Sequence, residues 1–269
     1  MTKAVVRVTR PEDLYGAVVR AGRTALAAPR RPVYLEIPTD LLSADVPAPE
    51  EIAAEPALAA AVPTDAVAAA LASAERPLIW AGGGATAAGA GELVGQLARR
   101  LGAPVLTSYG GRGLLPPDAP ELVPLPPHAP EAGALWDDAD VVLVVGSDLD
   151  AMNTQGFRQP RPPRLLTIDL AEPATYPPDE WVAADAAVAL GAVLEQLPDG
   201  SRTPWWTRPG GRASYAGPET EFLDAVEAAL PADAVVVADM CIPGYWYGAF
   251  GRVNSARGLA YPVGWGTLG

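Results

Sequence analysis

The stretch ADVVLVVGSDLD (residues 139–150) decides the fold class, because it places the continuous apolar run VVLVV directly before a Gly-Ser-Asp turn. A strand whose residues are all apolar is typical of a parallel sheet that is covered on both faces. Helical and strand patterns alternate around it; the predicted elements are helix 64–74, strand 78–81, helix 88–101, strand 105–107, helix 131–136, strand 164–168 and helix 185–197. This alternation predicts a doubly wound, Rossmann-like parallel sheet in an α/β protein.

Two shorter pieces of α/β pattern flank this central domain. The strand VYLEI (33–37) follows a predicted strand and helix, and the strand VVVA (235–238) follows a predicted helix. Proline-rich stretches separate the pieces. We predict that residues 1–42 are the C-terminal end of a first domain and that residues 64–197 form the central domain. Residues 218–269 are the predicted beginning of a third domain, and the predicted linkers are 43–63 and 198–217. Because a typical α/β domain needs about 100 residues or more, we expect the chain to be a segment of a larger protein.

Composition excludes several classes of function. The formal net charge of −13 argues against partners that are nucleic acids or membrane surfaces. No apolar run reaches the ~18 residues of a membrane span, and no signal peptide is visible, so we expect a cytoplasmic protein. The single cysteine, Cys241, rules out an intrachain disulfide. The single histidine, His128, rules out a zinc site built from several histidines. A Ser-His-Asp triad would have to use His128, which lies in a proline-rich loop.

Candidate ligand groups follow the predicted strands of the central domain. Gly82, Gly83 and Gly84 open a G-x-G-x-x-A pattern between a strand and a helix, where backbone amides can approach a phosphate. Asp148 and Asp169 come after two further strands, at the edge where α/β sheets bind ligands, and could accept a ribose hydroxyl. The alternatives are a tight turn without a ligand for the glycines and loop solvation or helix capping for the aspartates.

Seven segments stand out in order along the chain: RRPVYLEIPTDLL (30–42), RPLIWAGGGA (76–85), LGAPVLTSYGGRGLLPPDAP (101–120), ADVVLVVGSDLD (139–150), LLTIDL (165–170), VVVADM (235–240) and YPVGWGTLG (261–269). Together they resemble the thiamine-diphosphate enzymes of the acetolactate synthase and pyruvate decarboxylase group. The resemblance covers nearly the whole chain, and no single motif decides it.

The resemblance implies the cofactors thiamine diphosphate and Mg²⁺ for the full-length protein. The family's catalytic glutamate lies early in the first domain, outside this chain, and Glu36 stands in the wrong strand to replace it. The family's metal motif, G-D-G…N, lies beyond residue 269. We therefore assign no catalytic residue and no metal ligand here, and we expect the segment alone to be inactive.

Five residues are implied as cofactor contacts. The Gly266 carbonyl would accept from the cofactor's 4′-amino group, and Leu268, after Thr267, would hold the cofactor in a bent form. Asp239 and Cys241 would belong to a loop over the diphosphate. From its surroundings alone, the Cys241 thiol could equally be a buried or bystander group.

The central domain holds FAD in some members of this group, and two departures argue against FAD here. The stretch Gly146-Ser147-Asp148 carries no arginine, and Asp169 is followed by Leu170 and Ala171 rather than by a second acid.

The implied activity is decarboxylation of a small 2-oxo acid, with protonation of the product or its addition to an acceptor. Such an enzyme is a lyase or a transferase, and its intact form is expected to be a homodimer or tetramer. Two alternatives stay open: a nucleotide-binding module that uses the glycine turn, and a non-catalytic subunit of a split enzyme.

Overall fold

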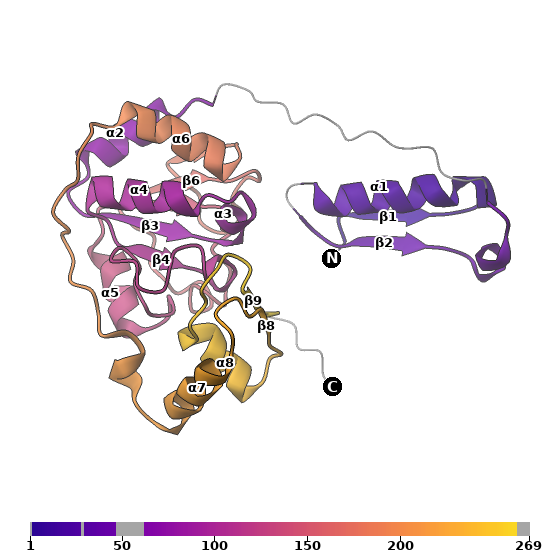
Figure 1. Ribbon diagram of the computed structural model, residues 1–269. Helices are drawn as coiled ribbons and strands as arrows, with labels where there is room; N and C mark the ends of the chain where they lie inside the picture. The colour runs from indigo at the N-terminus through magenta and orange to yellow at the C-terminus, as the bar shows by residue number, and fades with distance from the viewer. Residues whose placement is uncertain (1, 28–29, 47–61, 263–269) are drawn as a thin grey trace. The chain divides into compact units, whose positions relative to one another are not determined.

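The computed structural model describes residues 2–27, 30–46 and 62–262, and its chain divides into two compact units, Met1–Ala61 and Val62–Gly269. In the described part of the chain, no helix is both long enough and apolar enough to cross a bilayer. The two units are taken separately below (Figure 1).

The first unit is a small βαβ motif. Strands β1 and β2 pair in parallel, with Ala4 opposite Val33 and Arg7 opposite Glu36. One crossover helix connects them, while Val5 and Tyr34 remain exposed. The elements are β1 (Ala4–Arg7), a 3₁₀ turn (Pro11–Asp13), α1 (Leu14–Leu26), β2 (Val33–Glu36) and a second 3₁₀ turn (Thr39–Ser43).

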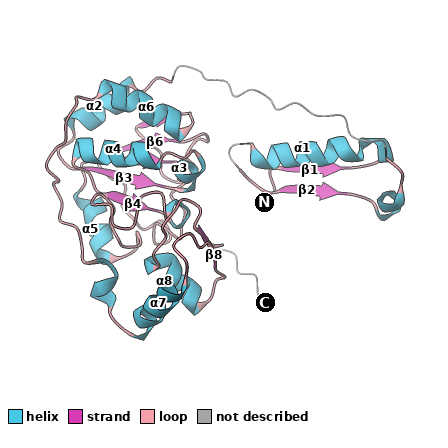
Figure 2. Ribbon diagram, in the orientation of Figure 1, coloured by secondary structure: helices cyan, strands magenta, loops and turns pink. Residues whose placement is uncertain are grey.

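The second unit is built around a five-stranded parallel sheet with the strand order β4-β3-β5-β6-β7 (Figure 2). This order, in which the first strand lies between the second and the third, is a doubly wound arrangement and confirms the predicted fold class. Strand β7 had no counterpart in the sequence prediction. The strands are β3 (Pro77–Ala81), β4 (Val105–Thr107), β5 (Val141–Val145), β6 (Arg164–Ile168) and β7 (Glu180–Val182).

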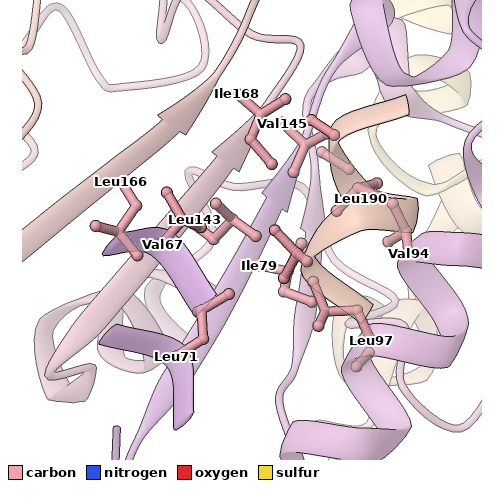
Figure 3. Packing of buried hydrophobic residues seen from close by; sticks show 14 of the residues in the cluster. Val67, Leu71, Ile79, Val94, Leu97, Leu143, Val145, Leu166, Ile168 and Leu190 are labelled. Carbon is pink, nitrogen blue, oxygen red and sulfur yellow. The ribbon is translucent and has the colours of Figure 1, made fainter. Parts of the chain in front are cut away.

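Helices cover both faces of this sheet, so its central strands are wholly buried. Side chains such as Ile79, Leu143 and Leu166 point toward α2, α4 and α6, where they meet Leu71 and Leu97 (Figure 3). The alternate side chains of the same strands pack against α5 in a second cluster that contains Trp80 and Trp136. The helices are α2 (Asp65–Ser73), α3 (Gly83–Ala87), α4 (Gly91–Leu101), α5 (Pro130–Asp138) and α6 (Ala186–Gln196).

The helix predicted over residues 88–101 differs from the observed elements. The chain forms the short helix α3, leaves helical geometry, and starts α4 only at Gly91. Gly89 lies between the two helices with a φ of +66°, a left-handed conformation that glycine adopts without steric cost. This one residue therefore separates two helices where the apolar periodicity indicates a single one.

The C-terminal part of the second unit forms a smaller layer against the central domain. Strands β8 and β9 pair in parallel, with Val236 opposite Leu259. The Tyr215 hydroxyl donates to Glu131 of α5 at 2.9 Å, which joins the layer to the central domain. The elements are a 3₁₀ turn (Gly211–Tyr215), α7 (Pro218–Ala229), β8 (Val236–Val237), α8 (Ile242–Phe250) and β9 (Leu259–Ala260).

Two valines of α6 test whether two-sided burial stabilises the unit. Val193 is fully buried and Val188 is 49% exposed. We expect Val193→Ala to lower the free energy of unfolding by about 2 kcal/mol, because it removes two buried methyl groups and leaves a cavity. Val188→Ala is the matched control and should change it by less than about 0.5 kcal/mol. Urea denaturation of both variants is the measurement, and equal losses would contradict the assigned faces of α6.

Candidate functional site

The first candidate site lies where β8 and β9 end. The two strands are parallel neighbours, and the Ala238 amide donates to the Ala260 carbonyl at 3.0 Å just past them. Because parallel strands end at the same edge of a sheet, the segment that contains Asp239 and Cys241 starts beside the segment that starts at Tyr261. The structure thus brings the beginnings of both predicted cofactor segments to one edge. Gly266, Thr267 and Leu268 themselves lie outside the described residues.

The turn after β8 has a backbone suited to an anion. Cys241 is the N-cap of α8 and its side chain is exposed, while Asp239 accepts the Met240 amide at 2.7 Å. The amides of Ile242 and Gly244 lie in the first turn of α8, where a helix has no backbone acceptors to offer them. A Cβ on Gly244 would collide with the Asp239 carbonyl oxygen, so glycine is needed for this close approach. These features fit one end of a diphosphate.

A metal site is not formed by the described residues. Within 2–27, 30–46 and 62–262, no three histidine, cysteine or acidic side chains gather closely enough to hold a metal ion.

Three rings meet beside this edge. Tyr109, which follows β4, lies with its ring centroid 5.6 Å from that of Tyr261. Its hydroxyl is 3.4 Å from Nδ1 of His128, and its amide donates to Oδ1 of Asn153 at 3.2 Å. Burial raises the pKa of Tyr109 to about 12, so the hydroxyl stays protonated at neutral pH. The described partner of His128 is therefore a tyrosine, not the serine that a triad would need.

The second candidate site is the carboxyl edge of the central sheet. Gly82, Gly83 and Gly84 follow β3, Asp148 follows β5, and Asp169 follows β6. Since β3, β5 and β6 are consecutive in the sheet, the structure brings all five predicted residues to one edge. Binding of a nucleotide there stays a prediction.

The glycine turn of this edge is used for packing. The Gly84 amide donates to the Gly146 carbonyl at 2.8 Å, so it is already engaged by the protein. A Cβ on Gly82 would lie 2.5 Å from the Ser147 Cβ, and one on Gly84 would lie 2.7 Å from the Gly146 Cα. The loops after β3 and β5 thus touch backbone to backbone, and the glycines are needed for that contact whether or not a ligand binds.

The aspartates at this edge have structural partners. An Oδ of Asp169 accepts the Ala171 amide at 3.0 Å, and the Asp148 carbonyl accepts the Thr175 hydroxyl at 2.8 Å. Asp150 accepts the amides of Met152 and Asn153 at 2.8 and 3.0 Å. Loop capping accounts for Asp169 and Asp150, whereas the exposed Asp148 side chain lies at the surface.

One residue beside these sites had no predicted role. Arg112 lies in the quoted segment at 101–120, and its guanidinium donates to the carbonyls of Ala249 and Gly251 at the end of α8. An arginine after a glycine pair gives no signal of such a contact, because the contact joins residues far apart in the sequence.

Comparison with known proteins identifies relatives that match most of the chain. A family model described as "Thiamine pyrophosphate enzyme, central domain" matches residues 64–197. The Pseudomonas aeruginosa protein named probable 2-ketoarginine decarboxylase AruI is 34% identical over 96% of this chain and 49% of its own length. A benzoylformate decarboxylase of the same species is 30% identical over 85% of this chain and 46% of its own length.

Two further relatives extend the comparison. An indole-3-pyruvate decarboxylase of Azospirillum brasilense is 31% identical over 76% of this chain and 38% of its own length. The crystal structure of a candidate thiamin diphosphate-dependent enzyme from Mycobacterium smegmatis covers 97% of this chain with a TM-score of 0.74, at 23% identity and over 53% of its own length. The chain thus spans about half the length of the curated relatives it matches.

The glycine contact between the β3 and β5 loops can be tested by measuring the stability of glycine-to-alanine variants. We expect Gly82→Ala to lower the free energy of unfolding by about 2 kcal/mol or more, since the new methyl group overlaps Ser147. Gly191→Ala in α6, where a Cβ meets nothing within 4 Å, should raise it by about 0.5–1 kcal/mol. Chemical denaturation compares the two, and a harmless Gly82→Ala would contradict the close approach.

The single histidine allows a clean titration. Partial burial lowers the pKa of His128 below its ordinary value of 6.5. The unfolded chain then binds the proton more tightly, so this residue's contribution to stability is present above pH 6.5 and is lost as the pH falls through the folded pKa. We expect the one histidine Cε1–H resonance to titrate with a midpoint below 6.5 in the native protein. A midpoint above that value would show that the contact with Tyr109 stabilises the charged ring.

Proposed function

Because the chain belongs to the thiamine pyrophosphate enzymes, we propose that it is a segment of a thiamine-diphosphate-dependent enzyme that decarboxylates a small 2-oxo acid. The observation that carries this proposal is the 34% identity to the protein named probable 2-ketoarginine decarboxylase, which extends over 96% of the chain. The names of two further relatives also denote decarboxylases of 2-oxo acids, benzoylformate and indole-3-pyruvate. The proposed substrate class is therefore a 2-oxo acid. In a related reaction, the group that remains after carbon dioxide leaves would be transferred to an acceptor.

The proposed roles of the chain's residues concern binding and orientation. The first-turn amides of α8 would hold the diphosphate, with Asp239 and Cys241 in the same loop. The Gly266 carbonyl would accept from the cofactor's amino group, and Leu268 would press the cofactor into its bent form. When bound, thiamine diphosphate supplies the carbon nucleophile and the electron sink for decarboxylation.

The remaining features of the intact protein are proposed on the family alone. They are Mg²⁺ bound with the diphosphate, a homo-oligomeric assembly, a cytoplasmic location and a central domain without FAD. The division at residues 42, 63, 197 and 217 is likewise a proposal. The nucleotide-binding alternative has less support, because the glycine turn that it needs is engaged by Gly146.

Turnover of a 2-oxo acid tests the proposed function. The longer protein that contains this segment should release carbon dioxide from 2-ketoarginine, benzoylformate, indole-3-pyruvate or pyruvate, and only when thiamine diphosphate and Mg²⁺ are present. Leu268→Ala should lower its kcat about tenfold or more, since a loosely held cofactor loses the reactive geometry. The 269-residue chain by itself is expected to show no turnover.

Val188→Ala is the control, because Val188 is 49% exposed on α6 of the central domain and has no proposed role in cofactor binding, and it should leave kcat unchanged. Release of carbon dioxide without thiamine diphosphate would refute the proposed cofactor. Cofactor binding without turnover of any 2-oxo acid would refute the substrate class alone.

A further inference from the structure

A cavity of about 220 Å³ lies between the edge strand β4 and the layer formed by α7 and α8. Among the residues that the structure describes, its lining includes none from β8 or β9 and none of the cofactor contacts proposed above. Its wall consists of apolar side chains together with three arginines and one glutamate. The residues that matter for its chemistry are Thr107, Arg112, Arg212, Glu227, Phe250 and Arg252.

The one acid in this wall is already engaged. Oε1 of Glu227 accepts from Arg212 at 2.7 Å and from the Arg252 amide at 2.6 Å, and Oε2 accepts from Arg212 at 2.8 Å. Arg212 also pairs with Asp224 at 2.5 Å. Arg212 is thus neutralised by two carboxylates, and both oxygens of Glu227 already accept hydrogen bonds.

Arg112 is different. Two of its guanidinium nitrogens donate to the carbonyls of Ala249 and Gly251, with the first distance 2.6 Å. A guanidinium carries five N–H donors. Within the part of the chain that the structure describes, no carboxylate lies within ion-pair distance of it. Burial lowers the pKa of Arg112 to about 10, although the nearby Glu227 carboxylate acts in the opposite direction.

A largely buried charge that makes no direct ion pair is costly, and the usual solution is an ion pair or a bound ligand. The cavity is where such a ligand would lie, since Arg112 and Thr107, the last residue of β4, both line it. Arg252, which is exposed, adds a second positive charge at the same cavity. The volume is below the roughly 300–1,000 Å³ of pockets for drug-sized ligands, so a small molecule or group fits.

We propose that this cavity binds a small oxyanion, a phosphate or carboxylate group, with Arg112 as its charged contact and Thr107 as a hydroxyl donor. Arginine suits this role because its planar fork of donors matches both kinds of oxyanion. The inference stands independently of the proposed catalytic function.

A purely structural role for Arg112 is the competing explanation. Its contacts with the last carbonyls of α8 place a cation at the negative end of a helix, which is stabilising by itself. That role accounts for two of the five donors and predicts that loss of Arg112 lowers stability without changing any response to anions. The two explanations therefore differ in a measurable way.

The experiment is anion titration of the 269-residue chain at constant ionic strength, by thermal unfolding and calorimetry. Inorganic phosphate and acetate are the two test anions, and chloride is the reference. We expect saturable stabilisation of the wild-type chain by phosphate or acetate, and the anion that saturates identifies the chemical class. Arg112→Met should weaken that anion's affinity about tenfold or more, and Thr107→Val about three- to tenfold.

Arg158→Met is the matched control, because Arg158 is an exposed arginine on another loop, and it should retain the wild-type affinity. Unsaturable stabilisation, or equal affinities in wild type, Arg112→Met and Thr107→Val, would overturn the proposal. If Arg112→Met does not fold, the nearly isosteric Thr107→Val decides the matter, since it leaves the contacts with α8 in place.

Discussion

The second unit depends on the burial of a parallel sheet from both sides. Strands β3 and β5 are apolar throughout because neither face reaches water, and each therefore needs a helix layer above and below it. The side chains of one face meet α2, α4 and α6, and those of the other meet α5 and its loops. Once both faces are covered, ligands can reach the sheet only at its edges, which is where the candidate residues lie.

This constraint explains which parts of the fold could be predicted. The apolar runs at 141–145 and 164–168 predicted strands with the observed bounds, because continuous burial leaves a strong signal. Strand β7 carries Glu180 and Trp181, so its pattern is weak, and the sheet around it determines its conformation. Helix α8 was also missed, since its glycine and aromatic content resembles a loop while its stability comes from packing around Tyr247.

The candidate sites were predictable only to the level of the sheet edge. The strand order places Gly82, Asp148 and Asp169 after neighbouring strands at one edge, whereas the alternating pattern predicted only that each of them follows a strand. The sequence could not reveal that the glycines face Gly146, or that Arg112 reaches the end of α8, because these contacts join distant segments. Long-range side-chain contacts of this kind depend on the finished packing and leave no local pattern.

The backbone contact between the β3 and β5 loops also constrains how this protein can evolve. Gly82 and Gly84 touch Gly146, so a side chain at any of the three positions must displace the opposite loop. Gly146 has in addition a φ of +59°, which disfavours every other residue. At Gly146, a substitution is therefore disfavoured both by contact with the opposite loop and by backbone conformation. Opening this crevice for a nucleotide would require the two loops to move apart, because their backbones themselves fill the space between them.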